Sequence, residues 1–506
     1  MPLTRRMLIG AGIAGLGGGG LMVRAQSAGA LDLREFGAIG DGRTDDGPAL
    51  RRALAALARR GGALRVPSGD FVIEDRSIVA GGVPYRLPPG ATLTGDGPGS
   101  RLMFRRVAGA AFYGLTIDGS DIAVRDLTLA VDSRGSGWTA AVGIIAAAAR
   151  LRFSGVMFTG TRVRGGHQGI LPIDADLDDL VVERCGFRTL EFGFTRQTTD
   201  SSDHRGLRFL DCVASDCTEV FEFNAPGLSR GVTRRGSALL SDLTDDDGRP
   251  LIPRVRVGQA IRSPAFPPGT RVLAVGPGRS VRLDRPALTD SPPDRPTRVS
   301  AGSCSGGVVR NLRCSNIGQW AIGMAHCDNW DVSVQGADVQ YELVHLEDGC
   351  RGIRVSVDGV RCNLSPGVVG SPKADNGMVH VSTGCRDVAV RFDDADLTQH
   401  RGALTNALCL QPGVMGTTGE RRATDNVTVS GRVLLRAGTR AVTAYETGIH
   451  FDRLELRNVD PWSRADLMLR LPGCRMSGTV LVLNPETVLE AGYGASGRFD
   501  MVRAVN

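Results

Sequence analysis

Two stretches of the sequence, ELVHLEDGC at residues 342–350 and GMVHVSTGC at residues 377–385, superpose without a gap 35 residues apart. In both, apolar residues alternate with other residues in the period of two that a half-buried β-strand requires, and a Gly-Cys turn follows. A strand and turn that recur in this way are typical of consecutive coils of a repeat fold, here joined by one long loop. The stretches therefore predict an elongated stack of parallel strands.

The same register extends to earlier parts of the chain. Pairs of apolar residues, spaced two apart, are expected to face inward and form ladders with rungs about 4.8 Å apart. These pairs are Leu171 and Ile173, Phe192 and Phe194, Phe221 and Phe223, Ile322 and Met324, and Val344 and Leu346. The 506 residues are 42% hydrophobic and include 68 glycines spread along the chain, which favours one long all-β domain and excludes a disordered chain or a disulfide miniprotein.

Two segments depart from the coil pattern. A single helix is expected after Thr44, which is a predicted N-cap, and it ends at the glycines of positions 61 and 62. Residues 231–300 are rich in Pro, Arg and Asp and contain short strand-like runs without a rung motif. We interpret them as a small β module inserted into a domain that comprises residues 31–230 and 301–506.

The N-terminal motifs carry a family resemblance. FGAIGDGRTDD at residues 36–46, VPSGDF at 66–71 and LTGDG at 93–97 resemble the opening of the pectate lyase/polygalacturonase superfamily, also called pectin lyase-like. This resemblance implies a single-stranded, right-handed parallel β-helix whose N-terminal end is capped by the helix. The superfamily includes lyases, hydrolases, epimerases and phage tailspikes, so the fold does not choose the chemistry.

The first 30 residues are expected to be an export signal. Arg5 and Arg6 precede an acid-free apolar run from Met7 to Val23, and small residues at positions 28–30 suit a signal peptidase. This pattern predicts a twin-arginine signal peptide and a periplasmic or secreted protein. No later stretch reaches the roughly 20 apolar residues of a membrane span, so no stable membrane insertion is expected.

The charge and the cysteine content bear on which ligands the protein can bind. The formal charge of +6 falls to +3 without the signal, and neither a basic stripe nor a base-stacking platform is visible, which argues against nucleic acid. The odd number of cysteines, 11, and their position at equivalent strand starts (Cys327, Cys350 and Cys385) predict a buried stack of thiols. No CxxC pair or Cys/His cluster has metal-ligand spacing, so no metal centre is expected.

Candidate catalytic residues lie at the positions that alternate with the inward ladder. One predicted column contains Pro172, Gly193, Glu222, Gly323, His345 and His380, and its neighbour contains Asp174, Thr195, Asn224, Ala325, Glu347 and Ser382. Cleavage of a glycosidic bond needs a proton donor and a second carboxylate roughly 5 to 10 Å away, about one or two rungs. Glu222 and Glu347 are the first candidates for this pair, with His345 orienting or tuning one of them.

Other residues near these columns are candidates for binding the substrate. Asp174, Glu191, Arg196 and His380 are expected on the same sheet face, and Trp138 offers a ring on which a pyranose can stack. Aromatic residues are scarce, at 5% of the chain, so recognition is expected to depend on arginine and carboxylate hydrogen bonds. A charged or highly hydroxylated glycan fits this composition.

The function predicted from these residues is carboxylate-assisted hydrolysis of a polysaccharide or oligosaccharide. One alternative is a polysaccharide lyase that acts on a uronic-acid polymer by β-elimination, for which calcium is a possible cofactor; no cofactor is expected for the hydrolase. Another is a non-catalytic glycan-binding β-helix. The catalytic motifs of polygalacturonases are missing or out of order, so their residues are not carried over. The long parallel stack suits either a monomer or a trimer.

Overall fold

The protein is described from a computed structural model. The residues described are 29–74, 85–106, 112–133, 139–161, 166–173, 175–195, 202–224, 227–244, 255–267, 269–292, 296–339, 342–361, 377–397, 406–414, 421–435, 439–458, 469–483, 496–497 and 500–504. The predicted signal peptide, apart from Gly29 and Ala30, lies outside them.

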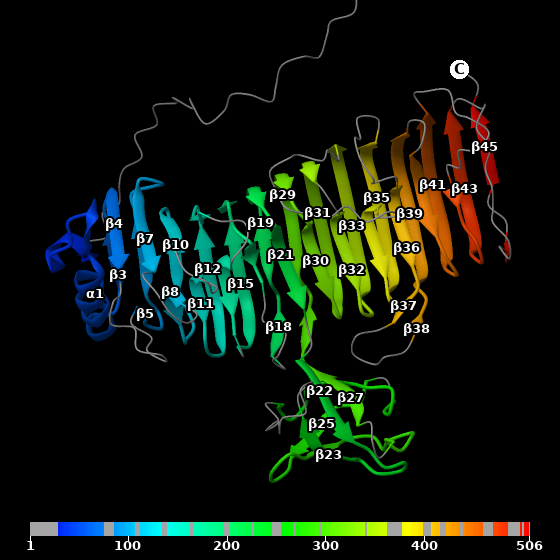
Figure 1. The fold of residues 1–506 in the computed structure, drawn as a ribbon, viewed down its shortest axis with the longest axis horizontal. Helices are drawn as coiled ribbons and strands as arrows, with labels where there is room; N and C mark the ends of the chain where they lie inside the picture. The colour runs from blue at the N-terminus through cyan, green and yellow to red at the C-terminus, as the bar shows by residue number, and fades with distance from the viewer. Residues whose placement is uncertain are drawn as a thin grey trace, which may run out of the picture.

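The chain forms a parallel β-helix, which confirms the predicted fold class. Figure 1 shows strands stacked side by side along one long axis, with the chain advancing from the blue N-terminal end to the red C-terminal end. Every pairing in the two large sheets is parallel, because each strand pairs with the strand one coil away. A stack of this kind buries its apolar ladders in a single continuous core.

The smaller of the two large sheets has 12 strands and carries the candidate site. Its strands are β5 (Arg86–Leu87), β8 (Phe112–Ile117), β11 (Thr139–Ile144), β14 (His167–Pro172), β17 (Phe192–Phe194), β21 (Glu219–Asn224), β30 (Trp320–Ala325), β32 (Glu342–Glu347), β34 (Gly377–Ser382), β36 (Asn406–Gln411), β40 (Arg440–Ala444) and β42 (Leu469–Arg470).

The larger sheet has 25 strands and forms the other walls of the helix. Its strands are β1 (Leu31–Asp32), β2 (Asp41–Asp45), β3 (Ala63–Val66), β4 (Gly69–Glu74), β6 (Thr92–Gly95), β7 (Ser100–Arg106), β9 (Ala123–Arg125), β10 (Thr128–Ser133), β12 (Ala148–Ser154), β13 (Met157–Thr159), β15 (Leu177–Glu183), β16 (Gly186–Arg188), β18 (Asp203–Arg205), β19 (Arg208–Leu210), β20 (Val213–Cys217), β28 (Ser303–Ser305), β29 (Val308–Ile317), β31 (Cys327–Val339), β33 (Arg351–Arg361), β35 (Arg386–Asp396), β39 (Asp425–Leu435), β41 (Gly448–Asn458), β43 (Arg475–Leu483), β44 (Ser496–Gly497) and β45 (Asp500–Ala504). A hairpin of β37 (Gly413–Val414) and β38 (Arg421–Arg422) lies outside both sheets.

The corners of the large sheet are turned by residues in the left-handed backbone region. Asp126, Arg184, Asp211 and Asn311 have φ between 50° and 57° and recur at neighbouring corners. Asp and Asn tolerate this conformation better than most residues. The amide of Asn311 donates to Oδ1 of Asp211 at 2.8 Å, so the corner side chains also bond one another from coil to coil.

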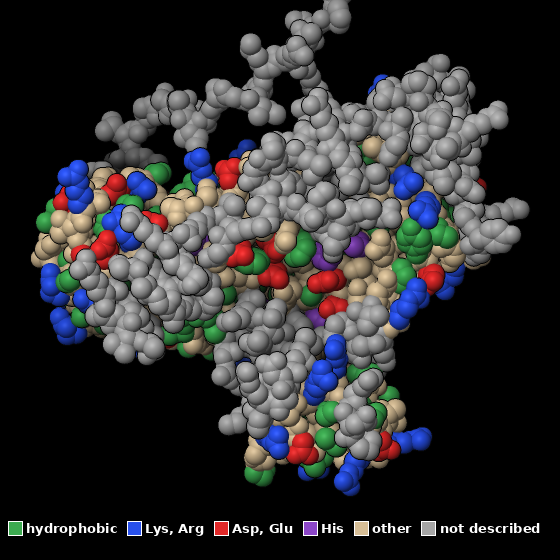
Figure 2. Space-filling view, in the orientation of Figure 1, with side chains coloured by type: hydrophobic (Ala, Val, Ile, Leu, Met, Phe, Trp, Pro, Cys, Tyr) green, Lys and Arg blue, Asp and Glu red, His purple; other side chains and the backbone are tan. Residues whose placement is uncertain are grey.

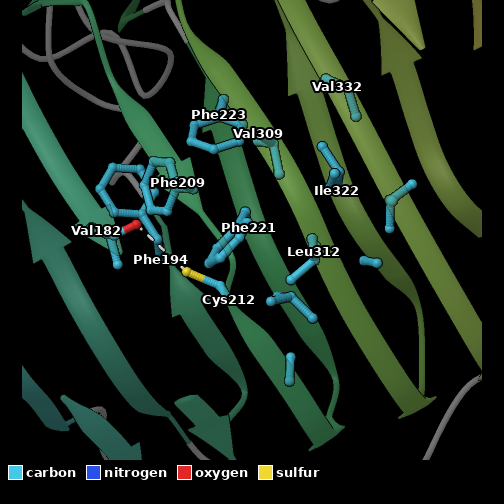
Figure 3. Packing of buried hydrophobic residues seen from close by; sticks show 14 of the residues in the cluster. Val182, Phe194, Phe209, Cys212, Phe221, Phe223, Val309, Leu312, Ile322 and Val332 are labelled. Carbon is cyan, nitrogen blue, oxygen red and sulfur yellow. Dashed lines mark hydrogen bonds between the residues drawn. The ribbon is translucent and has the colours of Figure 1, made fainter. Parts of the chain in front are cut away.

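Aromatic side chains fill the core beneath the middle of the stack (Figure 3). The rings of Phe209 and Phe221 lie 4.5 Å apart between centroids, and Phe223 lies 4.4 Å from Trp330. Dense packing of large rings at these distances fixes the register of the strands that carry them. The core therefore holds the sheet that carries Glu222 as a rigid support.

The cap helix α1 (Gly47–Arg60) begins later than the sequence predicts. Thr44 is not its N-cap; it lies in β2, where its hydroxyl donates to Asp41 at 2.9 Å. The cap position is Asp46, whose carboxylate instead accepts the backbone N–H groups of Ile39 and Gly40 at 2.7 and 3.1 Å. Asp46 thus ties the helix to the turn before it. The short 3₁₀ helix η1 (Leu33–Phe36) precedes that turn.

An antiparallel six-stranded module projects from the helix between β21 and β28 (Figure 1). Its strands are β22 (Gly227–Val232), β23 (Leu239–Thr244), β24 (Ile261–Arg262), β25 (Val272–Val275), β26 (Val281–Leu283) and β27 (Thr297–Ala301). It has a separate apolar cluster that includes Leu240, Phe266 and Leu283. Ion pairs from Arg256 to Asp176 and from Arg262 to Asp328 brace it against the helix.

The described cysteines, which omit Cys362, are all buried and free of disulfide bonds. Cys327, Cys350 and Cys385 occupy equivalent places at the starts of β31, β33 and β35, as the predicted thiol stack requires. Within the described part of the chain, no helix combines the length and apolarity needed to cross a bilayer.

Candidate functional site

The site lies on the outer face of the 12-stranded sheet, over β21, β30, β32 and β34. Register aligns Glu222, Gly323, His345 and His380 in one column of neighbouring rungs. The adjacent column contains Asn224, Ala325, Glu347 and Ser382. From β21 onward these are the predicted columns. Figure 2 shows acidic and histidine side chains gathered over the middle of the molecule.

The predicted register is wrong at β17. Phe194, not Phe192, pairs with Phe221, and Phe192 pairs with Glu219. The error arises because Phe192 and Phe194 have the same parity, so a period of two fits either alignment and leaves the register ambiguous by two residues. The predicted alignment of β14 is wrong as well. Ile170 pairs with Phe194, and Ile170 rather than Leu171 belongs to the core cluster. As a result Thr195, not Gly193, lies beside Glu222.

Two further carboxylates, Glu219 and Glu342, were missed by strict alternation. In each of their strands two consecutive residues, Val220 and Phe221 or Leu343 and Val344, face the core at the corner where the strand starts. The residue before such a pair therefore lies on the same side as the residue after it. A recurrent pattern identifies these positions: a polar residue is followed by two apolar residues and then by a second polar residue.

Glu222 is held by neutral hydrogen-bond donors. Its Oε2 accepts the hydroxyl of Thr195, and its Oε1 accepts the amide of Asn224 at 2.8 Å. Burial raises the pKa of Glu222, the two hydrogen bonds oppose that rise, and the charge of Glu347 adds to it. The environment therefore favours the protonated form more than water does.

Glu219 is buried behind Glu222 on the same strand. Burial, together with the charges of Glu222 and Glu191, raises the pKa of Glu219 to about 9. A hydrogen bond with Trp320 and the charge of His345 oppose the shift. Glu219 is therefore protonated at neutral pH. Glu191, a predicted binding residue, lies on the neighbouring rung, where its carbonyl accepts the backbone N–H of Glu219 at 2.8 Å.

Glu342 joins two histidines from consecutive coils. One of its oxygens accepts Nδ1 of His345, and the other lies 2.8 Å from Nδ1 of His380. Burial would raise the pKa of Glu342, but the charges and hydrogen bonds of the two histidines outweigh it and lower the pKa to about 2. Burial would lower the pKa of His345, yet the charge and hydrogen bond of Glu342 raise it to about 10.

Glu347 extends this chain of contacts toward solvent. Its Oε2 lies 3.2 Å from Nε2 of His345, and its side chain is 45% exposed. Burial would raise the pKa of Glu347, but the hydrogen bond and charge of His345 outweigh it and lower the pKa. Because Glu347 turns back toward His345, its carboxylate approaches the column that contains Glu222.

An aromatic ring lies between the two predicted catalytic carboxylates. The Trp320 indole stacks on the imidazole of His345 with ring centroids 5.0 Å apart and an angle of 21°. A Cβ on Gly323 would come within 2.4 Å of Nε1 of Trp320, so this position needs glycine for the indole to lie over it. Trp320 is only partly buried and offers part of its surface to a ligand.

Three predicted binding residues, Asp174, Arg196 and Trp138, lie outside the described residues. The inserted module does not supply the site's described carboxylates. A separate cavity of about 520 Å³ lies between the module and the helix, lined by Asp176, Asp203, Arg205 and Arg256 among others, and its lining includes neither Glu222 nor Glu347.

No protein-family model matches the chain. Mannuronan C5-epimerases AlgE1 and AlgE3 of Azotobacter vinelandii are 31% and 30% identical to it over 106 and 109 residues, about 20% of this chain. The chain spans only 8% and 6% of the length of these two relatives. Among solved structures, the A-module of the Azotobacter vinelandii mannuronan C-5 epimerase AlgE6 superposes with a TM-score of 0.52 and 15% identity, over 94% of this chain and 100% of the module. This likeness supports the parallel β-helix fold.

Proposed function

We propose that the protein acts on a glycan and cleaves its glycosidic bonds by carboxylate-assisted hydrolysis. The observation that carries this proposal is the placement of Glu222 on β21 and Glu347 on β32, two rungs apart, with Trp320 of the intervening strand β30 between them. Glu222 acts as the proton donor to the leaving oxygen, and Glu347 acts as the second carboxylate, either on water or on the anomeric carbon.

The geometry supports the two roles. Glu222 and His345 are two strands apart, about 9.6 Å, and Glu347 is two residues further along its strand. Because Glu347 turns back toward His345, its carboxylate lies nearer to Glu222 than the backbone does. The donors around Glu222 are a hydroxyl and an amide, which can hold a protonated carboxyl without a competing positive charge.

A glycan suits the surroundings of this pair. An open sheet face gives a chain of sugars a surface to follow, and the Trp320 ring offers a face for stacking. The matches to mannuronan C5-epimerases concern proteins named for action on a polysaccharide, and they support a carbohydrate as the class of substrate.

A second candidate function is abstraction of the proton beside a uronate carboxylate, as in a lyase or an epimerase. The similarity to the epimerases and the two adjacent histidines favour this candidate. The ionised carboxylates Glu342 and Glu347 weigh against it because their negative charge disfavours a polyanionic chain.

Product analysis separates these possibilities. The purified protein is incubated with neutral, aminated and uronic-acid polysaccharides, and reducing ends, ultraviolet absorbance and proton NMR spectra are followed together. New reducing ends without absorbance support hydrolysis. Rising absorbance marks an unsaturated uronate, and altered uronate stereochemistry without new ends marks epimerisation; either result overturns hydrolysis. Saturable binding without any product supports a glycan-binding role instead.

A further inference from the structure

Glu342, His345 and His380 form a compact group of nitrogen and oxygen donors. Each offers one ligand atom, and the three atoms lie within 4.8 Å of one another. Glu342 and His345 come from β32, and His380 comes from the next rung, β34. The rings of the two histidines lie 5.0 Å apart, nearly perpendicular at 84°, and present their Nδ1 atoms to the two oxygens of the same carboxylate, Glu342.

The surroundings of these donors point to a bound cation. The Glu342 side chain is only 1% exposed, and a carboxylate buried to this degree needs positive charge beside it, which the two histidines supply and which a bound divalent ion would supply in place of their protons. His380 is 9% exposed, and its Nδ1 faces Glu342 at 2.8 Å. The nearby carboxylates add negative charge that attracts a cation.

The contact between His345 and Glu347 has the form that supports a metal-bound histidine. Such histidines usually coordinate through one ring nitrogen and donate the other N–H to a carboxylate, which fixes the ring orientation. Nδ1 of His345 faces Glu342, and its Nε2 faces Glu347 at 3.2 Å. Glu347 thus occupies the place of the outer partner.

We propose that Glu342, His345 and His380 bind one divalent transition-metal ion of the zinc class, through the carboxylate and the two Nδ1 atoms. Two imidazoles and a carboxylate suit zinc and its neighbours, whereas calcium and magnesium prefer oxygen ligands alone. Tetrahedral coordination needs donor atoms roughly 3.3 Å apart. Glu342 lies within hydrogen-bonding distance of both Nδ1 atoms, so both separations widen when an ion replaces the protons, and the contact with His345 widens more than the contact with His380.

Three protein ligands leave a fourth position of the ion open, as in catalytic zinc sites rather than structural ones. Water or a substrate hydroxyl takes that position. Binding of the ion does not rest on the proposed hydrolysis, because it requires only the three ligands and is measured without a substrate.

The test is metal binding by the purified full chain. The protein is stripped with a chelator and titrated with Zn²⁺ in a calorimeter, and Co²⁺ is added separately to record its visible absorption spectrum. We expect one ion per chain and a cobalt spectrum typical of four-coordinate geometry. Glu342→Gln and His380→Ala should each weaken binding more than about 100-fold, because they remove a ligand rather than an outer partner.

Matched controls keep the result interpretable. His450→Ala removes a histidine on the other sheet, bonded to Ser477 at 2.9 Å, and should leave zinc binding unchanged. Glu347→Gln should weaken binding by only about 10- to 100-fold. Circular dichroism establishes that each variant is folded, and a variant that fails to fold is replaced by His345→Gln.

Two outcomes would overturn the metal site. The first is a wild-type chain that binds neither ion, and the second is zinc binding that Glu342→Gln, His345→Gln and His380→Ala all leave unchanged. If the ion binds but no glycan is cleaved, the metal site stands and the proposed hydrolysis fails. If a stripped protein without zinc affinity still releases reducing ends, the hydrolysis stands and the metal site fails.

Discussion

Oε1 of Glu342 lies 2.8 Å from Nδ1 of His380, although 38 residues separate the two in the chain. Their strands, β32 and β34, are adjacent rungs, so the stacking of coils assembles the pair. The same is true of Thr195 and Glu222, which are 27 residues apart and share a hydrogen bond. These two polar contacts of the site therefore depend on register between coils.

Glu222→Gln should lower the rate of glycan cleavage by about 100- to 10,000-fold, because the amide cannot donate the proton that the leaving oxygen requires. Substrate affinity and melting temperature should change little, since Gln keeps the shape of Glu and can still bond Thr195. Initial rates of reducing-end release measure the effect. Glu183→Gln, on the other sheet, is the control; equal rates in wild type and Glu222→Gln would refute the assignment.

Glu219 should make the protein less stable as pH rises. Its pKa in the folded state is about 9, above the ordinary value of 4.5, so between these values the folded chain holds a proton that the unfolded chain releases. The free energy of unfolding then falls with pH by up to about 1.4 kcal/mol per unit.

Urea denaturation of wild type and Glu219→Gln at pH 5, 7 and 8.5 measures this slope. The Gln variant should lack this contribution and gain stability relative to wild type as pH rises. Parallel pH profiles of the two proteins would show that Glu219 titrates normally.

Trp320→Ala should weaken glycan binding about two- to tenfold, the range expected for loss of one aromatic stacking partner. Gly323→Ala should have an effect of the same sign, because its methyl group would displace the indole. Calorimetric titration with an oligosaccharide that the protein binds measures both. Val275→Ala, at an exposed position of the inserted module, serves as the control, and undiminished affinity in Trp320→Ala would remove the ring from the site.

Phe221→Ala should lower the free energy of unfolding by about 3–5 kcal/mol, because it opens a cavity among tightly packed rings. Phe221 contacts Phe187 and Phe209 at centroid distances of 5.2 and 4.5 Å. Urea denaturation measures the loss. Leu239→Ala, whose side chain is 49% exposed on the module, should cost less than about 0.5 kcal/mol. Similar losses in both variants would mean that the rings do not carry the stability of the stack.

The fold could be predicted because the repeats of residues 342–350 and 377–385 align without a gap, and this alignment gives the register of two neighbouring strands. The columns through Glu222, His345 and Glu347 followed from that register. The alignment of Phe192 and Phe194 could not be fixed, since the two residues have the same parity and a period of two fits either of them opposite Phe221. Glu342 was missed because a period of two does not describe a corner at which two consecutive residues face the core.

The inserted module has a consequence for the order in which the chain folds. Asn316 and Asp216 bond across one rung although they are 100 residues apart, whereas Arg208 and Asp179 bridge a rung over 29. Closing the longer segment as a flexible loop would cost about 1 kcal/mol more. Pairing of Gly227 with Ala301 inside the module brings its two ends together. A module that is already folded therefore shortens the effective loop between the coils before and after it, and lowers the entropic cost of adding the later coils to the earlier ones.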